Sequence, residues 1–322
     1  MDVEKGLNMT VFWIVHLIML GVWALMMLYF LSVWLKSRVP GVGMRASRWR
    51  KLGAAIGYVL GIIFSRRIWP LLRAFIVEGL FQGRLLRKNL LRWSTHMAVF
   101  GSFLVMGVIS TLTGVVVEFL PLLGMSAEKV AAIPVLGQLF HADVGWVALV
   151  NELLGLVLLA GMILVLYRRY VKRDPQLRTN PIDNVIIFLL TLIAFSGIFT
   201  ETFRLLADYT TANGVFAPAA TMLSPEKLPP SLYPVWGPQW GFVGYALAWL
   251  FGLIKADPSV WQVVLNVVFW LHFLIVTALL FYLPFSRFAH VIAGPVIVAY
   301  NTMLDGESRR SRKGHGVPRP AA

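Results

Sequence analysis

Five long apolar stretches, separated by polar and basic connections, organise this chain of 322 residues. Each is close to the roughly 20 residues that an α-helix needs to cross the hydrocarbon core of a bilayer. We therefore predict an all-α membrane protein, built as a bundle of five transmembrane helices. The predicted spans are residues 9–35, 93–117, 146–167, 184–203 and 260–283.

Two further apolar regions are predicted to lie along the membrane surface. Residues 52–64 are too short to span a bilayer, and they continue into 68–90, where arginines interrupt the apolar positions as in an interfacial amphipathic helix. Residues 240–254 are also apolar, but a crossing there would move the basic C-terminal tail to the other side of the membrane. We expect interfacial helices on both faces of the membrane.

Basic residues are concentrated in alternate connections between the spans. Residues 36–92 contain thirteen Lys and Arg against one acidic residue, Glu78, and residues 168–183 contain five. The connection 118–145, by contrast, contains only Lys129. Since short basic loops stay in the cytoplasm, this alternation predicts an N-terminus outside and a C-terminus inside.

The same pattern divides the chain into four parts. Residues 1–35 form the first transmembrane helix, and 36–91 a basic interfacial segment on the cytoplasmic side. Residues 92–300 form a four-helix core with outer loops. The tail, 301–322, is polar and basic, so we expect it to be disordered. The expected location is the cytoplasmic (inner) membrane of a prokaryote, as a multi-pass protein.

The composition excludes several classes of protein. Hydrophobic residues make up 58% and charged residues 14%, whereas a soluble domain has about 45–50% and about 25%. The absence of cysteine excludes disulfides, and it excludes zinc or iron–sulfur sites held by this chain's own thiolates. The net charge of +14 is explained by cytoplasmic loops in contact with membrane lipid, so we expect no nucleic acid partner.

Four histidines lie in or beside the spans, where ionisable residues are costly and indicate function. His272 and His290 are 18 residues apart, which places both on one helix face about 27 Å apart, although Pro284 lies between them. His96 begins the second span at the depth of His290, and His16 lies in the first. Two imidazoles can hold one haem iron, and without thiolates haem b is the natural cofactor. The alternative role is hydrogen-bonded packing.

Three segments carry a resemblance to a known family: 92–100 (RWSTHMAVF), 197–206 (GIFTETFRLL) and 271–295, which contains LPFSRFAHVIAGP. They resemble the gamma subunit of respiratory nitrate reductase. They resemble more closely the membrane cytochrome b subunits of sulfite-reductase-linked and heterodisulfide-reductase-like complexes. The resemblance implies the quinone-reactive subunit of a multi-subunit oxidoreductase, which exchanges electrons between the menaquinone or quinone pool and a cytoplasmic iron–sulfur subunit.

The resemblance also implies axial ligands for two haems, with a single haem as the alternative. His96 and His290 match the pair that holds the haem nearer the cytoplasm, and His272 matches one ligand of the outer haem. The second ligand of that outer haem is open between Met106, ten residues after His96, and His16. A periplasmic cytochrome c or other membrane subunits are further candidate partners.

Three ionisable residues lie near the outer ends of the third and fourth spans: Glu152, Glu201 and Arg204. They are candidates for a site where quinone exchanges protons, and equally for an interhelical pair that fixes packing. Three arginines on the cytoplasmic side are candidates to neutralise haem propionates: Arg66, Arg67 and Arg287.

Two other functions remain open from the sequence. A proton-coupled transporter would use the same histidines and glutamates as a proton relay. A non-catalytic membrane anchor would recruit a soluble partner without using them.

Overall fold

The structure is a computed structural model that describes residues 9–36, 42–43, 45–126, 129–130, 133, 145–174, 181–218, 238–282 and 290–314. These residues are almost entirely helical, with one isolated β-bridge between Thr210 and Phe216 and no strand among them. Within the described residues, five helices are long and apolar enough to cross a membrane. The predicted all-α fold with five spans is therefore confirmed.

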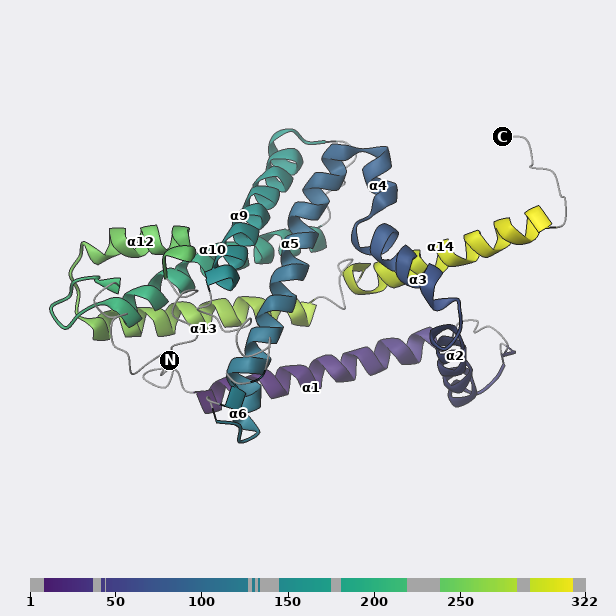
Figure 1. The fold of residues 1–322 in the computed structure, drawn as a ribbon, viewed down its shortest axis with the longest axis horizontal. Coiled ribbons are helices and arrows are strands. Elements are labelled where there is room, and N and C mark those ends of the chain that lie inside the picture. The colour runs from purple at the N-terminus through teal and green to yellow at the C-terminus, as the bar shows by residue number, and fades with distance from the viewer. Residues whose placement is uncertain are drawn as a thin grey trace. The chain divides into compact units, whose positions relative to one another are not determined.

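The five membrane-spanning helices follow the predicted stretches closely. They are α1 (Met9–Trp34), α5 (Leu90–Gly114), α9 (Gly145–Leu166), α10 (Pro181–Tyr209) and α13 (Pro258–Tyr282) (Figure 1). α10 continues beyond the predicted end at residue 203, because Leu205 and Leu206 are fully buried there, although charged residues interrupt the apolar run. The remaining elements are α2 (Arg48–Ile63), α3 (Ile68–Ala74), η2 (Phe75–Leu80), α4 (Gly83–Lys88), η3 (Val115–Phe119), α6 (Leu120–Leu122), η4 (Tyr167–Val171), η7 (Pro238–Trp240), α12 (Phe242–Gly252) and α14 (His290–Gly314).

The two regions predicted to be interfacial are both helical. α2 and the continuous stretch of α3 and η2 meet at a bend of 92°, and together they are apolar enough to count as a broken sixth span. α12 has 11 residues and is too short to cross a bilayer.

The chain forms two compact units. Unit 1 contains Met1–Ile14 and Thr95–Leu279, and unit 2 contains Val15–Ser94 and Leu280–Ala322. Each unit is described by itself.

In unit 1, α10 packs against both α9 and α12 (Figure 1). A buried cluster joins α10 and α12 to the start of α13 through Leu206, Ala248 and Trp261. On α9, Gly161 allows α5 to approach closely, since an added Cβ would lie 2.9 Å from the Cβ of Ala98. Small residues commonly mediate such contacts between membrane helices. Unit 1 is therefore a packed group of membrane helices with α12 held against α10.

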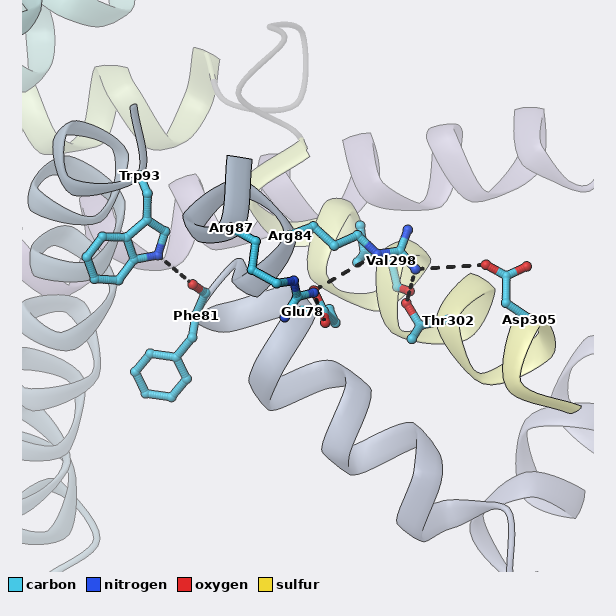
Figure 2. Close-up of polar contacts among 8 residues, drawn as sticks. All are labelled: Glu78, Phe81, Arg84, Arg87, Trp93, Val298, Thr302 and Asp305. Carbon is cyan, nitrogen blue, oxygen red and sulfur yellow. Dashed lines mark hydrogen bonds and ion pairs between the residues drawn. The ribbon is translucent and has the colours of Figure 1, made fainter. Parts of the chain in front are cut away.

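In unit 2, α3 and η2 pack against α14. A polar network lies on the same elements (Figure 2). Arg87 donates to Glu78 at 2.6 Å, while Arg84 donates to Thr302 at 2.9 Å and lies 3.8 Å from Asp305. The basic segment is therefore tied to the C-terminal helix by charged contacts.

The tail differs from its predicted disorder. α14 continues to Gly314, so residues 301–314 are helical. The contacts of Arg84 with Thr302 and Asp305 provide a physical reason, since they hold the early part of this segment against α4. Composition alone predicted disorder because it does not register a partner on another helix.

Candidate functional site

Glu152 of α9 caps the N-terminus of α12. Its Oε1 accepts hydrogen bonds from the backbone N–H groups of Val243 (2.9 Å) and Gly244 (3.1 Å). These are the second and third residues of α12, and the residue at the N-cap position, Gly241, has no side chain that could accept them. A carboxylate is also favoured there by the positive end of the helix dipole. Glu152 therefore fixes a helix that lies far from it in the sequence.

Glu201 of α10 lies beside this cap. Its two oxygens accept hydrogen bonds from Nε and Nη2 of Arg204, each at 2.9 Å, and Arg204 Nη1 also reaches Asp208 at 3.4 Å. The side chains of Arg204 and Glu201 are 18% and 28% exposed, so water screens the pair only partly. A bidentate arginine–carboxylate pair is among the strongest polar contacts in proteins.

The two carboxylates meet at Gly244. A Cβ added to Gly244 would lie 2.9 Å from Cγ of Glu201, and the backbone nitrogen of the same glycine donates to Glu152. Glu152 and Glu201 also repel each other electrostatically. The structure therefore brings together Glu152, Glu201 and Arg204, the three residues that the sequence suggested for a quinone site. They lie in unit 1, where α9, α10 and α12 meet.

His272 of α13 lies against the middle of α10. Its Nδ1 is 2.8 Å from Oγ of Ser196, and a Cβ added to Gly197 would be 3.6 Å from the ring Cε1. Among the described residues, this is the only hydrogen bond of the ring, so Nε2 is left for another partner. An imidazole with one nitrogen held and the other available fits an axial ligand of haem iron.

The carboxylates and His272 contact the same helix. Ser196 and Glu201 are five residues apart on α10, or about 7.5 Å along the helix axis. Among the described residues, no three His, Asp or Glu side chains gather as a metal site. A metal in this part of the chain would need one or two protein ligands, as haem iron does.

The other predicted haem ligands are placed but not paired. His96 is half-buried on α5 in unit 1 and stacks on Phe100, with ring centroids 5.5 Å apart. His290 is the first residue of α14, in unit 2, so the relation between His96 and His290 stays a prediction. Met106 is half-buried on α5, and His16 is half-buried on α1. The shared face of His272 and His290 is likewise untested, because residues 283–289 lie outside the described residues.

The arginines predicted to serve haem propionates have different outcomes. Arg66 and Arg67 are exposed in the turn between α2 and α3. Arg287 lies outside the described residues, as do His141 and His315. The propionate role therefore stays a prediction for all three arginines.

Sequence reasoning missed three groups in unit 1. Ser196, beside His272, had a recognisable signal: it is a small polar residue followed by Gly197 inside an apolar span, a pattern typical of helix contacts in membranes. Asp208 extends the Glu201–Arg204 pair by one further turn. The amides of α12 had no signal, because their acceptor belongs to another helix.

No protein-family model matches this chain, and no solved structure matches it. The chain is similar to a membrane-complex component, designated E, of the dihydromethanophenazine:CoB–CoM heterodisulfide reductase of Methanosarcina thermophila, with 26% identity over 47% of this chain and 54% of the relative. With the component of the same name in Methanosarcina barkeri it shares 24% identity over 72% of this chain and 66% of that relative. The relatives are reductase subunits.

These similarities bear on part of the sequence resemblance. They support its heterodisulfide reductase side, whereas the likeness to the nitrate reductase gamma subunit is not shown by them. The chain spans about half to two thirds of the length of the curated relatives it matches. With five apolar helices and such relatives, it is a multi-pass protein of the cell membrane.

Proposed function

We propose that this chain is a haem b membrane subunit of a respiratory redox complex. It transfers electrons between a menaquinone or other quinone pool and a cytoplasmic iron–sulfur subunit. The observation that carries the proposal is the position of His272. Its ring is held by Ser196 on the same helix that carries Glu201, about 7.5 Å further along the axis. A candidate iron ligand and a candidate proton acceptor are thus neighbours, in a chain similar to a reductase subunit.

The chain supplies imidazole ligands for haem and no thiolates. His96 and His290 would hold one haem, and His272 the other, together with Met106 or His16. When bound, haem b exchanges one electron at a time. Since the chain has no cysteine, an iron–sulfur cluster that receives or supplies these electrons has to be held by another subunit.

The carboxylates would handle the protons of the quinone reaction. Oxidation of one quinol to quinone releases two electrons and two protons. Protonation of Glu201 would weaken its double hydrogen bond with Arg204, whereas Glu152 accepts only neutral backbone donors from α12. Glu152 is therefore the better first proton acceptor, with the Glu201–Arg204 pair fixing the wall beside it. In the reverse direction the same groups would supply protons to quinone.

The direction across the membrane follows from the predicted orientation. With a cytoplasmic C-terminus, the end of α10 that carries Glu201 faces outward, and electrons travel inward to the partner subunit. A single cysteine at Ser311 tests this, because the native chain has none. We expect that Ser311→Cys in intact cells does not react with a membrane-impermeant thiol reagent. Labelling from outside would overturn the orientation.

A reduced-minus-oxidised spectrum of the purified protein, with haem quantified per chain, tests the function. We expect two haems b per chain and reduction by a quinol analogue. A colourless protein would overturn the proposal and would favour a proton-coupled transporter. A haem-free His96→Ala or His290→Ala variant that still supports the partner's activity would indicate a non-catalytic anchor.

A further inference from the structure

Ser196 and His272 form a polar contact between α10 and α13 that involves a candidate haem ligand. Ser196 lies near the middle of α10, and its Oγ is 2.8 Å from Nδ1 of His272. Either atom could donate the hydrogen, and the choice decides which nitrogen of the imidazole carries a lone pair. The surroundings of the serine hydroxyl settle this choice.

The hydroxyl of Ser196 has a single hydrogen to donate. Its Oγ is 2.6 Å from the carbonyl oxygen of Leu192, one turn earlier, and 3.3 Å from that of Ile193. Carbonyl oxygens only accept, and two oxygens 2.6 Å apart without a hydrogen between them would repel. The hydrogen of Ser196 therefore points at Leu192, which is the usual backbone contact of serine in membrane helices.

It follows that Ser196 can only accept from His272. The imidazole then carries its hydrogen on Nδ1 and its lone pair on Nε2. A doubly protonated, charged ring would be costly at this depth in a span. Because Nδ1 faces α10 and Gly197 adds no side chain beneath Cε1, Nε2 is directed away from α10.

We propose that Ser196 is a positioning residue: it locks His272 in the Nδ1–H tautomer, so that Nε2 serves as the iron ligand. This rests on the proposed haem function. A histidine ligand whose other N–H is hydrogen-bonded is better oriented and more basic. A more basic ligand stabilises oxidised iron, so the contact lowers the reduction potential of the haem that His272 holds.

The experiment compares three variants of the full-length protein with the native chain. Ser196→Ala removes the acceptor, and Ser196→Thr keeps a hydroxyl at the same place. Thr191→Val is the matched control, since Thr191 Oγ1 makes the same kind of backbone bond on α10, to Ile187 at 2.7 Å. The readouts are the midpoint potentials of both haems and the rate at which each haem is lost to excess apomyoglobin.

We expect Ser196→Ala to raise one midpoint potential and to weaken the binding of that haem about 10- to 100-fold. The other haem should keep its potential, which shows that the variant is folded. Ser196→Thr and Thr191→Val should behave like the native chain.

The possible failures are distinguishable. If Ser196→Ala leaves both potentials and both rates of haem loss unchanged, the positioning role is wrong, while the haem function stands. The same conclusion follows if Thr191→Val shifts the potential as much as Ser196→Ala does. A native protein without haem would overturn the proposed function, and the positioning role with it.

Discussion

Glu152 and Val243 are 91 residues apart in the chain and are joined by a hydrogen bond of 2.9 Å, from the amide nitrogen of Val243 to Oε1 of Glu152. The same oxygen accepts from Gly244 at 3.1 Å. An 11-residue helix such as α12 is marginal alone, so a cap from α9 contributes to its stability. The same carboxylate is the proposed proton acceptor, and the two roles can be separated by substitution.

Glu152→Gln should slow quinol oxidation without unfolding the protein. The amide keeps an oxygen for the two backbone donors of α12 but cannot take a proton. Loss of a general base typically costs about 100-fold or more in rate. We expect slower haem reduction by a quinol analogue in stopped-flow measurements, with unchanged haem content.

Glu152→Ala is the matched variant that also removes the cap. It should lower stability by about 1 kcal/mol, measured by thermal unfolding, whereas Glu152→Gln should not. If neither Glu152→Gln nor Glu201→Gln alters the reduction kinetics, these residues serve packing alone, and the quinone site lies elsewhere.

Arg204→Met should destabilise unit 1. The substitution removes both hydrogen bonds that Arg204 donates to Glu201 and leaves a partly buried carboxylate close to Glu152. The expected loss is about 1–3 kcal/mol in the free energy of unfolding. Combining it with Glu201→Gln should recover part of this loss, and a double-mutant cycle measures the coupling. Additive effects of the two substitutions would contradict the pairing.

Gly79→Ala should weaken the packing of η2 against α14. An added Cβ would lie 2.9 Å from the carbonyl oxygen of Pro295, and a backbone atom cannot move away easily. Overpacking of this kind costs about 1–3 kcal/mol, measurable by thermal unfolding. Gly57→Ala on α2 is the control, because nothing lies within 4 Å of its added Cβ. It should be neutral or stabilise by up to about 1 kcal/mol.

The haem ligands should separate by substitution. His290→Ala should abolish one low-spin haem signal and leave the other, and His272→Ala should abolish the second while sparing the first. Electron paramagnetic resonance with haem quantification measures both signals. Persistence of both haems in His290→Ala would show that the assignment is wrong.

Asp257, just before α13, should make stability depend on acid pH. Hydrogen bonds from the side chain and the backbone N–H of Ser259 hold the pKa of its carboxyl below the usual value. Its stabilising contribution is therefore complete above the unfolded pKa of about 3.9 and is lost as the pH falls through the lower folded value. Unfolding followed from about pH 5 downward should show a steeper loss in the native chain than in Asp257→Asn. Equal slopes would contradict it.

The sequence by itself determined where the membrane-spanning helices lie. The ends of α9 and α13 fall within two residues of the predicted ones, because the length of an apolar run is a local property that sets a helix in a bilayer. Residue type alone also selected Glu152, Glu201 and Arg204, because charge inside a span is costly wherever the helices pack.

Only the tertiary structure decided what those residues contact. Glu152 could have paired with Arg204, as the sequence allowed, but it caps α12, and Arg204 bonds to Glu201 on its own helix. The contact of Ser196 with His272, 76 residues away, is equally invisible to periodicity. Hydrophobic pattern records which face of a helix is apolar, whereas partner choice depends on how helices approach one another, and this is set by small residues such as Gly244 and Gly161 that admit a neighbour.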